Sequence, residues 1–287
     1  MKKKKRANKC DELNVTVEKK TDAIRCYSGQ MLYSGYAASI IGTRKEQQDS
    51  FAIVTFHANH SAGANSLLAV VCDGIGGFTA GKEASETAVA AVIEAFQETT
   101  RPLESFSDTF ERAAISADKK VISLSNKVGN HTGTTLVAVY LESDCLFWGN
   151  VGDSRLYLYR EGKITCLTRD HNYGLELQDM VRTKQISQED ADSNSEKEAL
   201  ISFIGMNDPA YIDTSECGIP LTEGDLLLLC SDGLYKSLTV EEIEGVLLQY
   251  TSMPSFIPGV LTASAFDKDY PHQDNTTVVV ITCQSGR

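Results

Sequence analysis

The chain has 287 residues, of which 42% are hydrophobic and 23% are charged, and its formal net charge is −12 at pH 7. This composition is typical of a globular protein with a sizeable core. The acidic balance argues against nucleic acid or an anionic membrane as the main partner, because both need a basic surface. The longest apolar runs, such as Leu226 to Cys230, have the length of a strand, so we expect a soluble protein without a membrane span.

The eight cysteines favour a reducing compartment over a disulfide framework. They are scattered along the chain, form no CxxC pair and follow no secretory signal peptide. Disulfides persist mainly in oxidising compartments. We therefore expect the protein to be cytoplasmic.

Residues 1–30 form a polar lead with weak periodicity and a basic cluster from Lys2 to Arg6. A cluster of this kind can touch acidic lipid or a partner, but runs of charge are more often solvated tails. We place this extension outside the folded domain and expect it to be disordered. The domain itself is predicted to span residues 31–285.

Apolar patterns predict a strand-rich first half with two long helices. Strands are expected at residues 33–41, 51–56, 66–72, 134–141, 145–151, 156–160 and 164–167, and helices at residues 82–98 and 105–127. Glu161-Gly162-Lys163 is predicted to close a tight hairpin. Alanines from Ala84 to Ala95 lie at helical spacing on one face, where small side chains permit close approach to a sheet.

A polar, acidic stretch from His171 to Ile212 interrupts this pattern, with short helical patterns at residues 173–183 and 195–204. We interpret it as an insertion over the scaffold. Beyond it, strands are expected at residues 226–230 and 276–283, and helices at residues 239–249 and 255–266. Two runs of strands with helices outside them predict an α+β fold, a four-layer α/β/β/α sandwich of two mainly antiparallel sheets flanked by helices.

A glycine-rich turn places one carboxylate at the end of the strand at residues 66–72. Asp73 is followed by Gly74, Gly76 and Gly77, and an alanine-rich helix begins a few residues later. Without Cβ atoms, these glycines let the backbone approach a ligand closely, so a carbonyl oxygen can join the carboxylate. Hard oxygen ligands in such a place suit Mg²⁺ or Mn²⁺.

Three further aspartates lie at predicted strand ends. Asp232 follows the strand at residues 226–230, Asp274 precedes the last strand, and Asp49 lies between two early strands with Arg44 nearby. Each one alone is explained by turn chemistry, since Asp-Gly and Asp-Asn are common turn dipeptides. Together they indicate a joint purpose, at a place where strands of one sheet bring their ends together. Clustered carboxylates repel one another unless cations neutralise them, which favours a shared metal site.

The chain resembles the metal-dependent serine/threonine protein phosphatases of the protein phosphatase 2C family, in their bacterial form. The resemblance covers about residues 31–283, and its motifs occur in the family's order. Each motif is weak, but six in order are highly specific. They are the segment Arg44 to Asp49, Asp73-Gly74-Ile75-Gly76-Gly77 with Gly81 and Ala84-Ser85, Gly133-Thr134-Thr135, Asn150-Val151-Gly152-Asp153-Ser154-Arg155, Ser231-Asp232-Gly233-Leu234, and Asp274-Asn275-Thr276.

This resemblance implies the metal ligands. Asp73 is expected to bridge two Mg²⁺ or Mn²⁺ ions, and Gly74 to offer its carbonyl oxygen to one of them. Asp232 and Asp274 are expected to complete the protein ligands of the other ion. Asp49 is expected to hold metal-bound water.

It also implies how the reaction proceeds. Two ions lower the pKa of a bridging water, which attacks phosphorus in line without a covalent phosphoenzyme. Arg44 is expected to grip the substrate phosphate with its planar fork, and acts with Asp49 and Asp73 as a catalytic residue. Asp153, with Asp232, matches a pair that binds a third, looser ion in this family.

Three positions depart from the animal members of the family. Ile75 stands where they carry a histidine proposed as a general acid, so the leaving group must take its proton elsewhere. Gln47 stands where an asparagine is common, and Gln48 where they have a metal-binding glutamate. The second ion is therefore expected to hold more waters and to bind more weakly.

Rival chemistries find little support. A cysteine phosphatase needs an arginine six positions after its thiolate, but Phe78 has that place after Cys72. Gly129-Asn130-His131 resembles part of the calcineurin-like phosphoesterase pattern, yet the paired histidines are missing. His57 and His60 could form an HxxH metal pair, but the surrounding loop, Ala58 to Asn65, is polar and offers no other ligands, so solvated histidines are the better interpretation. Arg155, beside a strand start, more often makes a structural ion pair.

The sequence thus predicts a bacterial phosphatase that hydrolyses phosphoserine and phosphothreonine on proteins, opposed by a cognate serine/threonine kinase and monomeric. The alternative is a pseudophosphatase that keeps the fold and binds a partner without catalysis. A scaffold would have little reason to keep Asp49, Asp73, Asp232 and Asp274, so the enzyme is favoured. Residues 171–212 correspond to the family's flap beside the cleft, which either contacts substrates or is a tolerated insertion.

Overall fold

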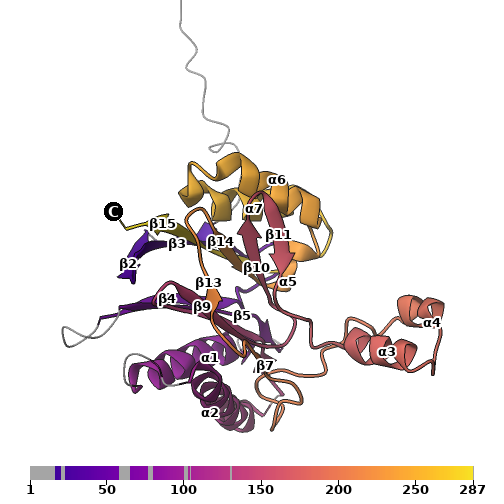
Figure 1. The fold of residues 1–287 in the computed structure, drawn as a ribbon. Coiled ribbons are helices and arrows are strands. Elements are labelled where there is room, and N and C mark those ends of the chain that lie inside the picture. Colours follow the sequence, from indigo (N-terminus) through magenta and orange to yellow (C-terminus); the bar gives the residue numbers. More distant parts are fainter. Residues whose placement is uncertain are drawn as a thin grey trace, which may run out of the picture.

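The computed structural model describes residues 17–20, 23–57, 65–76, 80–99, 103, 105–129 and 131–286. Two antiparallel sheets pack face to face, and helices cover the outer face of each sheet (Figure 1). The predicted four-layer α/β/β/α sandwich is therefore confirmed. No helix of the described residues is long and apolar enough to cross a membrane.

The strands are, in chain order, β1 (Val17–Lys20), β2 (Ile24–Ser28), β3 (Met31–Ile40), β4 (Ser50–Phe56), β5 (Ser66–Cys72), β6 (Gly74–Ile75), β7 (Gly133–Thr134), β8 (Leu136–Glu142), β9 (Cys145–Val151), β10 (Arg155–Arg160), β11 (Lys163–Cys166), β12 (Asp213–Thr214), β13 (Ile219–Pro220), β14 (Leu226–Cys230) and β15 (Thr276–Ser285). The helices are α1 (Ala80–Gln97), α2 (Phe106–Val128), α3 (Tyr173–Arg182), α4 (Gln188–Ser193), α5 (Asp232–Tyr235), α6 (Val240–Tyr250), the 3-10 helix η2 (Pro254–Phe256) and α7 (Ile257–Phe266). The longer predicted elements are present with ends shifted by two residues or fewer.

The larger sheet has the strand order β1-β3-β15-β14-β10-β11, with β2 also paired to β3. The smaller sheet has the order β12-β9-β8-β5-β4, with β13 also paired to β9, and a short separate ladder joins β6 to β7. Strand β9 belongs to the smaller sheet and β10 to the larger one. Residues 152–154 between them therefore cross from one sheet to the other.

The central strands are apolar at every position because both faces of each sheet are covered. In β5, Leu68 packs toward α1 and α2, whereas its neighbour Leu67 packs between the sheets. In β14, Leu227 packs between the sheets and Leu228 packs toward α6 and α7. Antiparallel sheets usually expose one face and alternate apolar with polar residues. Here, helices on the outside remove that alternation and leave continuous apolar runs.

Helix α1 lies close against the smaller sheet through its small residues. Ala84, Ala88 and Ala91 are buried and contact the apolar cluster that includes Leu68 and Val70 of β5. The predicted role of the alanine face is therefore confirmed.

The predicted tight hairpin between β10 and β11 is also present. Glu161 and Gly162 have φ values of 52° and 80°, as a two-residue turn with a right-handed strand twist requires.

Two predictions about elements were wrong. The boundary at residue 30 falls inside the larger sheet, because β2 pairs along β3 from Ile24↔Gly35 to Ser28↔Met31. Such a short strand, closed by a two-residue turn, gives too few positions for its alternation to be recognised. The prediction for residues 1–16 lies outside the described residues. The second helix of the insertion is α4 and not residues 195–204; it begins at a capping box of Ser187 and Asp190, a local signal that outweighs periodicity.

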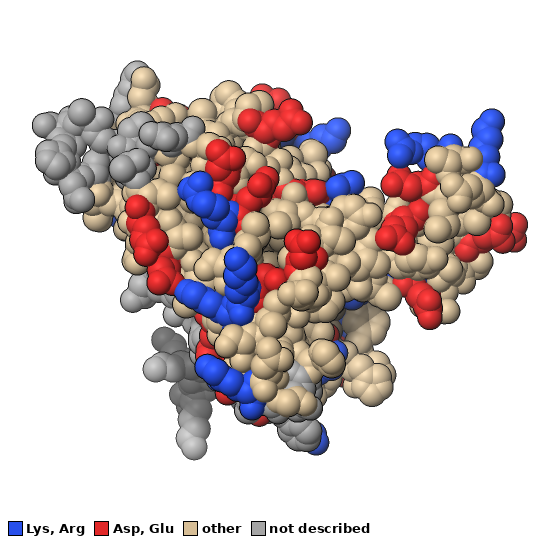
Figure 2. All heavy atoms as spheres, turned by 90° about the horizontal axis from the view of Figure 1, so that it is seen from below, with Lys and Arg blue, Asp and Glu red and all other residues tan. Residues whose placement is uncertain are grey.

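The insertion forms a lobe that stands away from the sandwich. Helices α3 and α4 lie to the side of the four layers (Figure 1), and a surface view from below shows acidic and basic side chains side by side on this lobe (Figure 2). The base of the lobe is tied to the scaffold, because Thr134 and Ile204 exchange two backbone hydrogen bonds of 2.9 Å. Asp118 of α2 also accepts hydrogen bonds from the amides of Gly205 and Asp208. The lobe is therefore mounted on β7, beside the turn that carries Asp73.

Candidate active site

Five aspartates lie at one end of the sandwich, where strands of both sheets begin or end. Asp73 follows β5 and Asp49 precedes β4 in the smaller sheet, whereas Asp232 follows β14 and Asp274 precedes β15 in the larger sheet. Asp153 lies in the crossover from β9 to β10. The expectation that one sheet would supply the whole set was wrong in this respect. Face-to-face packing brings the ends of the two sheets together.

The backbone of Asp73 is held from the β7–β8 region. Its amide donates to Thr135 Oγ1 at 2.9 Å, and its carbonyl oxygen accepts from the Thr135 amide and from Thr134 Oγ1. Thr135 Oγ1 is also 2.7 Å from Ser154 Oγ in the crossover. These contacts fix where the Asp73 carboxylate begins, and they explain why threonines follow Gly133 in the motif.

Gly74 is required by close backbone packing. A Cβ atom on Gly74 would lie 2.2 Å from the carbonyl oxygen of Gly81 and 2.6 Å from that of Gln48. A Cβ atom on Gly81 would in turn lie 3.0 Å from the Gly74 carbonyl oxygen. The carbonyl group proposed as a ligand therefore lies against the first turn of α1. Gly77, the last of the three glycines of this turn, lies outside the described residues.

Asp49 joins the two sheets. Its side chain is buried, with 3% of the residue exposed, and its Oδ2 accepts a 2.7 Å hydrogen bond from Ser231 Oγ. Ser231 is itself held by Thr277, whose amide donates to Ser231 Oγ at 2.9 Å. Asp49 Oδ1 is buried and has no hydrogen-bond partner among the described residues. One carboxylate oxygen is thus fixed and the other is left for a ligand.

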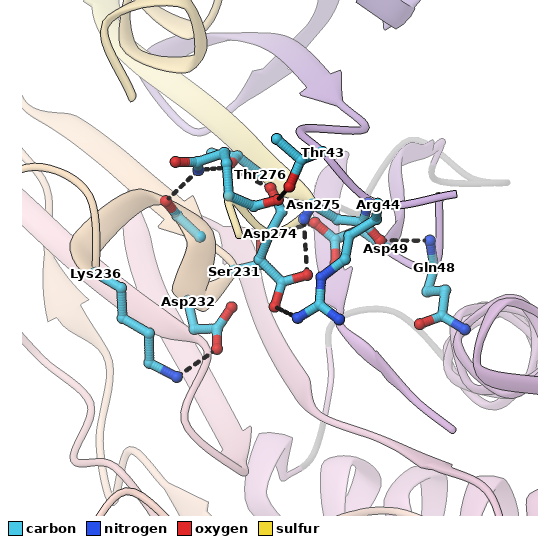
Figure 3. A network of polar contacts seen from close by, with 12 residues as sticks. Thr43, Arg44, Gln48, Asp49, Ser231, Asp232, Lys236, Asp274, Asn275 and Thr276 are labelled. Atoms are coloured by element: carbon cyan, nitrogen blue, oxygen red, sulfur yellow. Dashed lines mark hydrogen bonds and ion pairs between the residues drawn. The ribbon is translucent and has the colours of Figure 1, made fainter. Parts of the chain in front are cut away.

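Two of the carboxylates are paired with basic side chains (Figure 3). Asp274 Oδ2 lies 2.6 Å from Arg44 Nη2, and Asp232 Oδ2 lies 2.6 Å from Lys236 Nζ. As they stand, no three acidic, histidine or cysteine side chains of the described part of the chain converge on one point. The guanidinium and ammonium groups supply the positive charge that a dense group of carboxylates needs.

The loop that carries Arg44 is clamped by Asn275. The Asn275 side-chain amide donates to the carbonyl oxygens of Ile41 and Glu46, and its Oδ1 accepts from the Gln48 amide at 2.8 Å. Asn275 follows Asp274 directly, so the loop and this carboxylate are placed by the same strand end (Figure 3). Arg44 itself remains half exposed, with 55% of its side chain accessible. It can therefore reach a ligand from the solvent side.

Arg155 has a structural role, as the sequence suggested. Its guanidinium makes a two-pronged contact with Asp170, at 2.9 and 2.6 Å, and stacks 3.6 Å above the ring of Tyr235. The Tyr235 hydroxyl then donates to the carbonyl oxygen of Asp153 at 3.0 Å. Arg155 thereby braces the backbone of the crossover.

The electrostatics of the cluster favour bound cations. The pKa of Asp49 is raised to about 7. Burial is the main cause and the charges of Asp232 and Asp274 add to it, whereas hydrogen bonds act to lower it. Burial followed by the charge of Asp49 raises the pKa of Asp73 well above its usual range. Burial and then Asp232 raise the pKa of Asp153 to about 6. These carboxylates are costly to ionise together. Hard oxygens, two of them buried and unpartnered on Asp49 and Asp232, fit divalent cations such as Mg²⁺ or Mn²⁺.

Comparison with known proteins decides the family. The family model described as protein phosphatase 2C matches residues 38–265. The chain is also 34% identical over 221 residues to a serine/threonine phosphatase, stp, of Listeria welshimeri. The aligned residues cover 76% of this chain and 84% of the relative. This chain belongs to the protein phosphatase 2C family. It is therefore an enzyme of the protein phosphatase class, and the resemblance inferred from its motifs is confirmed.

Solved structures agree with this assignment. The serine/threonine phosphatase of S. agalactiae superposes with a TM-score of 0.73 at 28% identity, covering 87% of this chain and 99% of that one. The catalytic domain of the phosphatase PstP, solved in complex with two manganese ions, superposes with a TM-score of 0.67 at 27% identity, covering 88% and 99%. The sandwich of this phosphatase is thus the fold of its family.

The metal-free phosphatase should lose stability as the pH rises. Between about pH 4 and pH 7 the folded protein keeps protons on Asp49 and Asp153 that the unfolded chain has released, so the free energy of unfolding falls with rising pH. We expect a melting temperature about 5 °C lower at pH 8 than at pH 6, and a smaller difference in Asp49→Asn. Calorimetry in chelator measures both. An equal difference in the variant and the parent phosphatase would show that Asp49 does not carry the effect.

One residue at the site was not singled out from the sequence. Lys236 lies one helical turn after Asp232 and touches its carboxylate. The i, i+4 spacing on the short helix α5 was the available signal, because side chains four residues apart lie on the same face of a helix. The motif Ser231-Asp232-Gly233-Leu234 ends just before it. The cysteines of the described residues are free thiols.

Proposed function

We propose that this phosphatase hydrolyses phosphoserine and phosphothreonine on proteins by direct attack of water, with two Mg²⁺ or Mn²⁺ ions. Asp73, the Gly74 carbonyl oxygen, Asp232 and Asp274 would hold the ions, and Asp49 would hold water beside them. The observation that carries this proposal is the buried group of carboxylates at the junction of the two sheets, with unpartnered oxygens on Asp49 and Asp232.

Each residue of the site would have its own role in the reaction. When bound, two divalent ions supply a water of lowered pKa and offset the charge on the phosphoryl oxygens. Arg44 binds the substrate phosphate through its planar fork and stabilises the charge that builds in the transition state. Asp49, fixed by Ser231, orients water for in-line attack on phosphorus. Ile75 provides no proton donor, so the departing serine or threonine oxygen takes its proton from water.

We further propose that the partners are phosphorylated proteins, a serine/threonine kinase and its targets, and that the enzyme is a monomer. We also propose that the lobe at residues 171–212 contacts the substrate protein. The bonding of its base to β7, next to the Asp73 turn, supports this role. The cytoplasmic location expected from the cysteines stays a prediction. A pseudophosphatase has no comparable support. A protein without catalytic activity would have no need to retain carboxylates that repel one another.

Metal dependence tests the proposal. Protein stripped with chelator should release phosphate from a phosphothreonine peptide about tenfold faster, or more, once Mn²⁺ or Mg²⁺ is added. Phosphate is measured by a colorimetric assay, with Ca²⁺ as a comparison ion of the same charge and larger size. Full activity in chelator, or none in saturating Mn²⁺ and Mg²⁺, would count against the enzyme as described.

A further inference from the structure

Lys236 places a positive charge between two carboxylates at the edge of the site. Its Nζ lies 2.6 Å from Asp232 Oδ2 and 4.0 Å from Asp153 Oδ2. These are the two carboxylates that the family resemblance assigned to a third, looser metal ion. In this chain, the Lys236 ammonium group already contacts both carboxylates that would bind that ion.

The position of Lys236 follows from the fold around it. Helix α5 begins at Asp232 and makes a single turn, and the Lys236 amide donates to the Asp232 carbonyl oxygen at 2.9 Å. The side chain at position i+4 is thereby brought back over Asp232. Tyr235, the preceding residue, is held between the Arg155 guanidinium and the Asp153 carbonyl oxygen. The turn that carries the ammonium is therefore fixed on the side of Asp153 as well.

The two oxygens of Asp232 face different environments. Oδ2 is bonded to Lys236, whereas Oδ1 is buried and has no hydrogen-bond partner among the described residues. In Figure 3, Asp232 lies between Lys236 on one side and Asp274 on the other. Oδ1 would therefore be available to help hold one of the two ions, whereas Oδ2 is bonded to Lys236. The ammonium would therefore compete with a third ion for Oδ2 of Asp232, and would leave Oδ1 for the two-ion site.

Charge balance agrees with this division. The five carboxylates of the cluster carry five negative charges when ionised, and two divalent ions neutralise four of them. The Lys236 ammonium neutralises the fifth, which leaves the Arg44 guanidinium for the phosphate. A lysine side chain carries its positive charge at neutral pH.

We propose that Lys236 is a built-in replacement for the third metal ion, so that this phosphatase binds two ions and not three. The proposal rests on the two-ion function above and revises the expectation that Asp153 is a metal ligand. Asp153 instead pairs, together with Asp232, with the ammonium. Lys236 is a positioning residue in this scheme, because it acts on the site through Asp232 and Asp153.

Counting bound ions tests the proposal independently of activity. Equilibrium dialysis with Mn²⁺ should give two ions for the parent enzyme and for Lys236→Arg, which keeps the charge. Lys236→Met, which keeps the length and removes the charge, should give a third, weaker site, and the double variant Lys236→Met with Asp153→Asn should lose it. Lys268→Met is the matched control, because Lys268 pairs with Glu242 away from the site. It should bind two ions.

The outcomes separate this proposal from the proposed function. Three ions in the parent enzyme, with the third lost in Asp153→Asn, overturn the replacement by Lys236 and leave the two-ion mechanism intact. Two ions in a Lys236→Met protein that melts cooperatively also overturn it. Fewer than two ions in the parent enzyme overturn the two-ion mechanism and this proposal with it. If Lys236→Met fails to fold, Lys236→Gln provides the same comparison with a side chain that can still donate to Asp232.

Discussion

Replacing Asp73 by asparagine is expected to lower kcat/KM for a phosphothreonine peptide by about a thousandfold or more. Asp73 is the residue through which both ions would be held, so its loss removes the charge that binds them and the water they supply. Its backbone contacts with Thr134 and Thr135 do not involve the carboxylate and should persist. Steady-state phosphate release in saturating Mn²⁺ measures the loss.

The same variant should be at least as stable as the parent enzyme in the absence of metal. Burial and the neighbouring carboxylates raise the pKa of Asp73 far above its usual range, so its ionised form is costly in the folded state at neutral pH. A neutral asparagine removes that cost. Loss of activity with a maintained or higher melting temperature in chelator would therefore distinguish a catalytic role from damage to the fold.

Asp118→Asn is a matched control for a buried aspartate with a structural role. Asp118 is 4% exposed and accepts hydrogen bonds from two amides at the base of the lobe. We expect this variant to lose stability by about 1–3 kcal/mol, because charged hydrogen bonds to backbone amides weaken. It should keep its activity below its melting temperature.

An Asp73→Asn enzyme with more than about a tenth of the parent activity would contradict the two-ion assignment.

Replacing Arg44 by alanine is expected to lower kcat/KM by about 10- to 100-fold, which corresponds to the loss of one or two charged hydrogen bonds to phosphate. Arg44→Lys should recover part of this loss, because an ammonium keeps the charge but cannot make the two-pronged contact. Initial rates over a range of peptide concentrations separate an effect on KM from one on kcat. Arg112→Ala, on the outer helix α2, should leave both unchanged.

The metal requirement of the Arg44→Ala enzyme provides a second check. Without metal, Arg44 is bonded to Asp274, an expected ligand. Removing the guanidinium frees this carboxylate, so the Mn²⁺ concentration for half-maximal activity should stay the same or fall. An increase would mean that Arg44 supports the ions and not the substrate phosphate.

Much of the site was predictable because its residues are local to strand ends. Asp73, Asp232 and Asp274 each adjoin an apolar run and a turn residue, and a carboxylate in such a place is visible in the sequence. The element pattern also predicted the four layers, since α1, α2 and the central strands have strong periodicity or continuous apolar runs. Short elements such as β2 and α5 were missed, because four or five residues are too few for a periodic signal.

The partners of each carboxylate were not predictable in the same way. Ser231 and Asp49 are 182 positions apart in the chain, and the packing of one sheet on the other brings them into contact. Arg44 and Asp274 are 230 positions apart, and the pairing of β3 with β15 in the larger sheet brings them together. Local sequence carries no record of which sheet a strand end will join. The sequence by itself determined the family, the layers and the set of carboxylates. The tertiary structure decided that both sheets supply this set, that Arg44 lies on Asp274, and that the Lys236 ammonium lies between Asp232 and Asp153. Strand pairing and sheet packing bring these residues together from distant parts of the chain.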